Sequence, residues 1–219
     1  MQKVIALNSG GIDSPVASFI VSKRFEVIAH YCNNYPFSDD VTMKRVLDTI
    51  KKLSEILKKP IKTYITPHGQ NTVEFLKVCG KRGRKFTCIF CRRMMFRVAF
   101  KIALKEGAVA LVSGENLGQV ASQTLQNIYV TEKALKMPIL RPLIGLDKID
   151  IERWGKDIST YEISVRRAIC CSVTPKYPSI NTQLKKFEEI EERLDIEDLV
   201  EKSFEKREIF FLEEKKNRD

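Results

Sequence analysis

The chain has 219 residues, of which 43% are hydrophobic, and a formal net charge of +10. This length predicts one domain, with or without an appendage, and the apolar fraction is ample for a core. No apolar run approaches the roughly 18–20 residues that a membrane-spanning helix needs, which argues against a helical membrane protein. Because a strand is predicted almost at Met1, we expect no signal peptide and a cytoplasmic location.

The charge is unevenly distributed along the chain. Residues 185–219 carry 9 Lys and Arg against 13 Asp and Glu, a net charge of −4, so the preceding residues carry +14. A basic body of this kind favours a polyanionic partner such as nucleic acid. An ordinary basic enzyme explains the same charge equally well, and composition does not decide between the two.

The first predicted elements are a strand, a glycine turn and a helix. Residues 4–7 are an apolar run typical of a buried strand, and residues 15–21 can open a helix with Pro15 in its first turn. Between them stands the run Ser9-Gly10-Gly11-Ile12-Asp13-Ser14. The sequence therefore places a glycine-rich turn directly before the start of a helix.

This turn is predicted to bind phosphate. The first N–H groups of a helix have no backbone partner, and the helix dipole adds partial positive charge there. Gly10 and Gly11 allow an anion to approach closely, while Ser9 and Ser14 add hydroxyl donors. A plain structural turn is the alternative. A carboxylate beside phosphates needs a cation between them, so Asp13 also predicts Mg²⁺.

Strands and helices alternate along the rest of the chain to residue 158. This alternation predicts an α/β fold: a parallel sheet of about five strands with helices on both faces. Ligands of such sheets bind beyond the carboxyl ends of the strands. The further strands are predicted at 25–31, 61–66, 109–112 and 139–144, and the helices at 39–58, 71–78, 91–106, 117–127 and 148–158.

The C-terminal part is predicted to be helical. Residues 184–212 are rich in charge with intermittent apolar positions, which indicates one long helix or two, packed on the domain or on a second subunit. We therefore divide the chain into a catalytic-type domain at 1–180 and a C-terminal helical extension at 181–219.

The cysteines suggest a metal or cluster site. Cys88 and Cys91 form a CxxC motif immediately before a predicted helix, and Cys170 and Cys171 form a second cluster. A zinc site needs four good ligands, whereas three thiolates with one open position suit a [4Fe–4S] cluster. A redox dithiol, half a zinc site or unremarkable cysteines remain alternatives, and Cys32 and Cys79 read as ordinary buried cysteines.

Several stretches resemble one family, the tRNA 4-thiouridine synthases (ThiI), over roughly residues 3–180. The Ser9–Pro15 turn matches the SGGxDS signature of PP-loop ATP pyrophosphatases, and Gly118-Gln119-Val120-Ala121-Ser122-Gln123 is the more specific match. The resemblance also covers residues 92–95, 113–124, 141–148 and 160–164. It implies a PP-loop fold of the adenine nucleotide α-hydrolase type, and an enzyme that adenylates the C4 oxygen of uridine 8 in tRNA and replaces it with sulfur.

The resemblance also implies roles for individual residues. Lys148 and Cys171 match catalytic positions: Lys148 would neutralise charge on the α-phosphate, and Cys171 would handle sulfur, as a persulfide in many relatives. Asp13, beside the predicted Mg²⁺, is expected to be catalytic as well. The ligand set of a [4Fe–4S] cluster would be Cys88, Cys91 and Cys171, with Cys170 as second choice for the last. ATP contacts are expected at the turn residues Ser9, Gly10, Gly11 and Ser14, and at Leu7, Asn8, His30, Tyr31, Arg92, Gly114 and Gln123.

The partners implied are tRNA and a sulfur donor, either sulfide or persulfide. We expect a form of the family with a CxxC motif and without its RNA-binding (THUMP) and rhodanese domains. The tRNA would then be bound by a separate THUMP-type subunit or by the basic segment at 81–85. The chain could also form a homodimer.

Two other functions compete with tRNA thiolation. One is a PP-loop adenylating sulfurtransferase for another acceptor, such as the sulfur carrier of thiamine-thiazole synthesis. The other is a non-catalytic iron–sulfur subunit that binds nucleotide and RNA. An intact set of Asp13, Arg92, Gln123, Lys148 and the cysteines favours an enzyme over the non-catalytic subunit.

Overall fold

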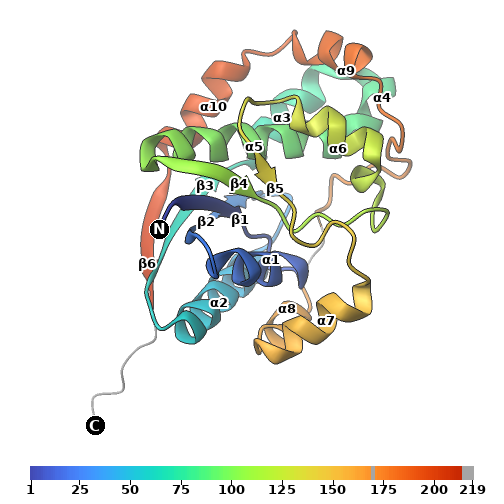
Figure 1. Cartoon of the computed structure of the whole chain (residues 1–219). Helices are drawn as coiled ribbons and strands as arrows, with labels where there is room; N and C mark the ends of the chain where they lie inside the picture. The colour runs from blue at the N-terminus through green and yellow to red at the C-terminus, as the bar shows by residue number, and fades with distance from the viewer. Residues whose placement is uncertain (169–170, 214–219) are drawn as a thin grey trace.

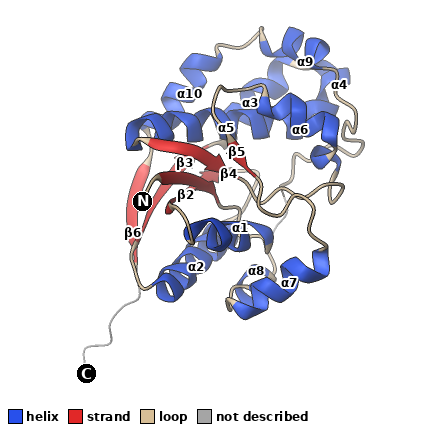
Figure 2. Cartoon of the chain, in the orientation of Figure 1, coloured by secondary structure: helices blue, strands red, loops and turns tan. Residues whose placement is uncertain are grey.

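The structure is a computed structural model that describes residues 1–168 and 171–213. A six-stranded sheet runs through its centre in the order β5-β4-β1-β2-β3-β6 (Figures 1 and 2). The first five strands in this order are mutually parallel, and β6 is antiparallel to β3. The strands are β1 (Lys3–Leu7), β2 (Glu26–Asn33), β3 (Ile61–Pro67), β4 (Ala108–Val112), β5 (Ile139–Leu140) and β6 (Glu208–Leu212).

Helices cover both faces of this sheet. In Figure 1, α1, α2, α7 and α8 lie on one side, and α3, α5, α6, α9 and α10 lie on the other. The helices on the first side are α1 (Asp13–Ser22), α2 (Asp40–Leu57), α7 (Lys148–Asp157) and α8 (Tyr161–Ser164). The others are α3 (Gly69–Val78), α4 (Gly80–Gly83), α5 (Thr87–Glu106), α6 (Leu125–Glu132), α9 (Leu184–Glu191) and α10 (Ile196–Glu205), with short 3-10 turns η1 (Arg84–Phe86) and η2 (Ala121–Gln123).

The core follows from the alternation of side chains along the central strand. Val4 and Ala6 are buried in the cluster formed with α1 and α2, whereas Ile5 is buried in the cluster formed with α5. A strand buried on both faces must be apolar throughout, and this explains the short uninterrupted apolar run at the start of the chain. The predicted α/β fold with helices on both faces is confirmed.

Three predicted elements differ in the structure, each for a local reason. The helix expected at 117–127 is a loop followed by η2 and α6, because Gly118 takes a left-handed φ of 76°. The strand expected at 139–144 shrinks to two residues, since Pro142 cannot donate to a strand ladder. The expected helix before Gly107 begins at Thr87, so Cys88 and Cys91 lie inside α5 rather than before it.

The segment after residue 180 is not helical throughout. It forms α9 and α10 and then β6, whose sequence Glu-Ile-Phe-Phe-Leu is rich in residues that favour strands. β6 extends the sheet beside β3, so the sheet has six strands instead of about five. The domain boundary at residue 180 stays a prediction.

The strand order reverses at β1, since the chain continues to β2 and β3 on one side and then crosses to β4 on the other. In parallel sheets such a reversal leaves a crevice at the carboxyl ends of the strands. In the described part of the chain, no helix has both the length and the apolar character required to cross a membrane.

Candidate active site

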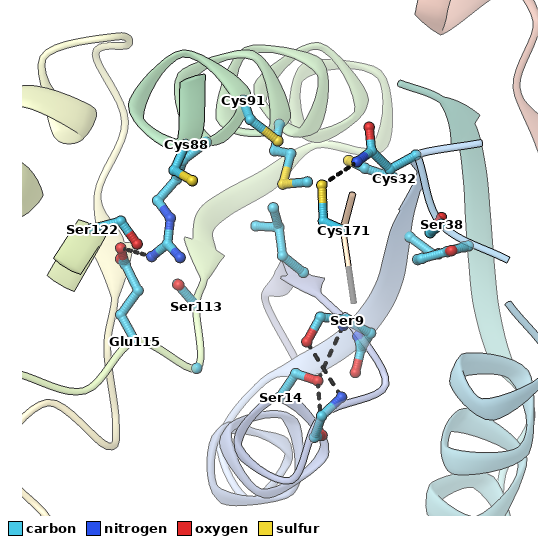
Figure 3. A pocket seen from close by; sticks show the side chains of 18 of the residues that line it. Ser9, Ser14, Cys32, Ser38, Cys88, Cys91, Ser113, Glu115, Ser122 and Cys171 are labelled. Atoms are coloured by element: carbon cyan, nitrogen blue, oxygen red, sulfur yellow. Dashed lines mark hydrogen bonds and ion pairs between the residues drawn. The ribbon is translucent and has the colours of Figure 1, made fainter. Parts of the chain in front are cut away.

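A cavity of about 470 Å³ lies at the carboxyl ends of β1, β2 and β4. It joins the glycine turn to the cysteines, which Figure 3 shows on opposite sides of one space: Ser9 and Ser14 on one side, Cys88 and Cys91 of α5 on the other. The predicted site residues that line it are Leu7, Asn8, Ser9, Gly11, Asp13, Ser14, His30, Tyr31, Cys88, Cys91, Arg92, Gly114, Gln123 and Cys171.

The glycine turn is shaped by its own serines. The backbone N–H of Ser9 donates to Ser14 Oγ at 3.2 Å, and that of Gly11 donates to Ser9 Oγ at 3.4 Å. The Ser14 hydroxyl in turn donates to the carbonyl of Gly11 at 3.5 Å. The serines predicted as phosphate donors therefore also fix the curvature of the turn at the start of α1.

Gly10 and Gly114 lie where neighbouring atoms leave little room for a side chain. Gly10 has a left-handed φ of 75°, and a Cβ there would meet Val46 of α2 at 3.0 Å, so it faces α2 and does not line the cavity. A Cβ on Gly114 would lie 3.0 Å from Ser14 N, because the loop after β4 packs on the first turn of α1. Gly11 has more space, with Ser9 Oγ nearest at 3.5 Å, and it lines the cavity.

Asp13 is paired with a lysine of the protein itself. Lys148 Nζ donates to Asp13 Oδ1 at 2.7 Å, and Lys148 begins α7 next to the capping residue Asp147. Asp13 lines the cavity, whereas Lys148 reaches it only through this ion pair. Since Lys148 already supplies a cation to the carboxylate, Asp13 does not by itself require Mg²⁺, and the metal stays a prediction.

Arg92 is held at the cavity wall by a buried carboxylate. It forms an ion pair with Glu115, which also accepts from Arg141 Nε at 2.8 Å. Burial alone would raise the pKa of Glu115, but the two guanidinium groups outweigh it and hold that pKa below the usual value. The ionised Glu115 fixes the orientation of the Arg92 fork, which suits a phosphate or another planar anion.

His30 and Tyr31 lie at the end of β2 and line the cavity. His30 is fully buried, with Nε2 at 2.9 Å from Thr66 Oγ1. Burial, with a smaller contribution from His68, lowers the pKa of His30 to about 3, so the ring is neutral at physiological pH. Burial likewise raises the pKa of Tyr31 and keeps its phenol protonated.

Part of the cavity wall carries polar atoms that lack a partner. Within the described ranges these atoms include Asn34 Oδ1, Arg45 Nε and Gln123 Oε1, and all three residues line the cavity. A buried polar atom left unpaired costs about 1–3 kcal/mol, so such a wall is suited to a ligand rich in hydrogen-bonding groups. A nucleotide has that chemistry.

The three cysteines come together from two distant parts of the chain. Cys88 and Cys91 lie in the first turns of α5. Cys171 lies on a loop, and the backbone N–H of the next residue, Ser172, donates to the carbonyl of Phe37 at 3.0 Å. Burial, followed by the charges of Cys171 and Cys88, raises the pKa of the Cys91 thiol. All three cysteines line the same cavity, and a cation bound among their thiolates would relieve the repulsion between them.

The cysteines do not form a complete metal site on their own. Among residues 1–168 and 171–213, no three His, Cys, Asp or Glu side chains stand in a ready metal-binding arrangement. Three thiols on one wall fit a sulfur-ligated cluster in number and chemistry, but the ligands would have to close around it. Cys170, the second choice for the third ligand, lies outside the described residues.

Sequence reasoning missed four residues that surround the site. Asn34, Arg45 and Glu115 line the cavity, and His68 contacts Cys91 Sγ from behind it. Glu115 stands inside the Ser-Gly-Glu-Asn part of the matching motif, which was a usable signal. Arg45 and His68 carry no local pattern, since only the folded chain brings them to the cavity.

The chain is similar to known proteins along most of its length. A family model described as "Thiamine biosynthesis protein (ThiI)" matches residues 1–196. A probable tRNA sulfurtransferase of Methanosarcina mazei is 40% identical over 200 residues, which is 90% of this chain and 49% of the relative. One of Thermoanaerobacter pseudethanolicus is 42% identical over 202 residues, 91% of this chain and 52% of the relative. The chain spans about half the length of these curated relatives.

Solved structures show the same fold. A crystal structure of a 4-thiouridine synthetase–RNA complex with bound ATP aligns with a TM-score of 0.89 and 36% identity, covering 96% of this chain and 55% of that one. An NAD⁺ synthetase from Burkholderia pseudomallei aligns with a TM-score of 0.55 and 10% identity, which shows likeness of fold alone. Because the family model spans the glycine turn, the CxxC motif and Cys171, the chain belongs to the ThiI family.

Proposed function

We propose that this chain catalyses ATP-dependent sulfur transfer to tRNA and converts uridine 8 to 4-thiouridine. The observation that carries the proposal is the single cavity lined by both the glycine turn and the three cysteines. A base bound in this cavity can then be activated by ATP and receive sulfur without leaving the cavity. The relatives named tRNA sulfurtransferases, and the synthetase solved with RNA and ATP, support it.

The first step is adenylation. The C4 oxygen of uridine attacks the α-phosphorus of ATP, the bond from that phosphorus to pyrophosphate breaks, and pyrophosphate leaves. The backbone N–H of Gly11 and the Ser9 hydroxyl bind the pyrophosphate at the start of α1. Arg92, oriented by Glu115, would offer two donors to the same charge, and Lys148 would stabilise the α-phosphate. Asp13 would hold a Mg²⁺ ion that accompanies ATP.

The second step replaces oxygen with sulfur. A sulfur nucleophile, delivered as hydrosulfide on the cysteine side of the cavity, attacks C4. The C4–O bond then breaks, AMP leaves with the bonding electrons, and the remaining proton is lost to water. Cys88, Cys91 and Cys171 would hold a [4Fe–4S] cluster, and such a cluster when bound would supply an open position for sulfur. Zinc, or a persulfide on Cys171, are the other outcomes to be tested.

The tRNA would approach over a basic segment beside the cysteines. Lys81, Arg82, Arg84 and Lys85 are exposed on α4 and η1, immediately before α5. Lys85 and Cys88 share the lining of a second, smaller cavity of about 290 Å³. This surface, or a separate tRNA-binding subunit, would hold the phosphate backbone.

The test is a reaction without oxygen that contains the protein, unmodified tRNA, ATP and sulfide, with iron and sulfide analysis of the protein used. We expect 4-thiouridine in the tRNA digest, together with AMP and pyrophosphate. The matched variant Cys171→Ser should bind ATP as the parent does and yield only background 4-thiouridine. Absence of 4-thiouridine from the parent protein, even with a tRNA-binding partner added, would refute the proposal.

A second acceptor is favoured by the description of the family model, which refers to thiamine biosynthesis. In that case a small sulfur-carrier protein with a C-terminal carboxylate would be adenylated in place of uridine. Release of pyrophosphate that rises with such a carrier, and does not respond to tRNA, would select this acceptor over tRNA.

A further inference from the structure

We propose that Asn34 and His68 are positioning residues that donate N–H···S hydrogen bonds to Cys171 and Cys91 and stabilise negative charge on those sulfur atoms. The inference deepens the proposed function, since it rests on these cysteines being the ones that handle sulfur. The two side chains would hold the sulfur atoms in place and tune their reactivity through their N–H groups.

The bond from Asn34 is direct. Its Nδ2 lies 3.1 Å from Cys171 Sγ, and the amide nitrogen can only donate (Figure 3 shows Cys171 with this bond dashed). Asn34 is buried just beyond the end of β2, so water competes little for the donor. A charge-assisted bond to a thiolate is therefore stronger here than it would be at the surface.

The bond from His68 is oriented by a second amide. His68 Nε2 lies 3.1 Å from Cys91 Sγ, and Asn71 Nδ2 lies 3.5 Å from His68 Nδ1. The same Asn71 amide contacts the Ser203 hydroxyl of α10: Nδ2 donates to Ser203 Oγ at 3.0 Å, and Ser203 Oγ lies 3.4 Å from Asn71 Oδ1. Because an amide N–H points at Nδ1, that nitrogen is the acceptor and the ring proton sits on Nε2, facing sulfur.

Both donors belong to one rigid pair of loops. β2 and β3 are adjacent parallel strands, and the N–H of His68 donates to the carbonyl of Asn33 at 2.7 Å. A Cβ on Gly69 would lie only 1.9 Å from the carbonyl oxygen of Tyr35, so the loops touch through their backbones. Cys171 is tied to the loop after β2 by its neighbour Ser172, so backbone contacts hold Asn34 and its sulfur acceptor together.

Hydrogen bonds to sulfur have a known chemical consequence. They favour the more negative form of a sulfur centre, so they increase the thiolate fraction of a free cysteine and raise the reduction potential of a sulfur-ligated cluster. This pair of donors supplies one such bond to Cys91, from His68 outside the cavity lining, and one to Cys171, from Asn34 on the cavity wall.

The first test needs no cluster. In cluster-free protein at one fixed pH, alkylation by iodoacetamide is followed at each cysteine by mass spectrometry. Asn34→Leu should slow the reaction at Cys171 by ~10-fold, and His68→Phe should slow it at Cys91 by a similar factor, since a bond to a charged group contributes about 1.5–3 kcal/mol. His68→Gln, which keeps an N–H donor, should restore most of the rate.

The control is Thr72→Val, an isosteric change on α3 one residue beyond Asn71. The hydroxyl of Thr72 is buried and lacks a partner in the described structure. Thr72→Val should leave both alkylation rates unchanged. Equal rates in Asn34→Leu, His68→Phe and the parent would overturn the proposal, with circular dichroism and the melting temperature used to show that each variant is folded.

The second test uses protein reconstituted with iron and sulfide. Both variants should shift the midpoint potential downward, and the double variant should shift it further. Should the parent protein hold a cluster whose potential is the same in all variants, the proposal fails even if tRNA is thiolated. If instead the alkylation rates change as expected while the parent makes no 4-thiouridine, the donor pair stands and the proposed function fails.

Discussion

The two ends of the cavity are built in different ways. The glycine turn is held by contacts between near neighbours in the sequence: Ser9 with Ser14, five residues apart, and Ser18 with Asn8, ten apart. The cysteine end is held by contacts across the chain, 137 residues from Asn34 to Cys171 and 23 from His68 to Cys91. The curvature of the phosphate turn is therefore set by near neighbours, although Lys148 and Gly114 reach it from far along the chain, whereas the sulfur end is assembled only in the folded protein.

This difference predicts that the two ends can be damaged separately. A change that alters the long-range contacts should affect sulfur chemistry and leave nucleotide binding intact. A change near the glycine turn or Arg92 should do the opposite. The four variants below are ordered from the largest expected loss to the smallest.

Glu115→Leu should give the largest loss, about 4 kcal/mol in the free energy of unfolding. It leaves the guanidinium groups of Arg92 and Arg141 without their buried carboxylate. ATP affinity should fall as well, while alkylation of Cys171 is unchanged. Urea denaturation and ATP titration measure the two effects. The control is Glu132→Leu, which removes a largely exposed partner of the same Arg141 and should cost under about 1 kcal/mol.

Gly69→Ala should cost about 3 kcal/mol and act on the opposite end. Its Cβ would overlap the carbonyl of Tyr35, and the backbone must shift to relieve the overlap. We expect faster, less selective alkylation of Cys171 with ATP binding retained. Gly145→Ala is the matched control, since a Cβ there meets no atom within 4 Å. If Gly69→Ala melted at the same temperature as the parent, the close contact between Gly69 and the Tyr35 carbonyl would be contradicted.

Because of His30, the free energy of unfolding should decrease as the pH falls below about 6.5. The pKa of His30 is about 3 in the folded protein, against 6.5 when exposed, so below pH 6.5 the unfolded chain takes up a proton that the folded chain does not. At pH 5 this one residue should reduce stability by about 2 kcal/mol relative to pH 7.5. Urea denaturation at both pH values measures it, and His30→Gln should remove that part of the pH dependence. An unchanged dependence in the variant would show that His30 is protonated while folded.

Lys148→Ala should have the smallest effect on stability, under about 1 kcal/mol, because its ion pair with Asp13 is partly exposed. Its effect on adenylation should be much greater, since in the proposed reaction its positive charge would face the developing negative charge of the α-phosphate. Exchange of labelled pyrophosphate into ATP measures adenylation. Lys202→Ala, which breaks an exposed pair with Asp198 on α10, should leave that exchange unaltered.

The same contrast explains what could be predicted from the sequence. The strand, turn and helix around Ser9 were predictable, because apolar runs and glycines encode them within twenty residues. That Cys88 and Cys171 line one cavity could be inferred only from the resemblance to a family. The loop at 117–120 and the strand β6 were missed, since the conformation of Gly118 and the free edge of β3 both depend on the folded protein.

The last strand also sets a limit on when this protein can finish folding during its synthesis. β6 comes from residues 208–212, yet it pairs with β3 from residues 61–67. A nascent chain that has emerged only as far as α10 still presents the backbone of β3 to its surroundings. The sheet behind the nucleotide turn is therefore complete only after residues 208–212 have left the ribosome.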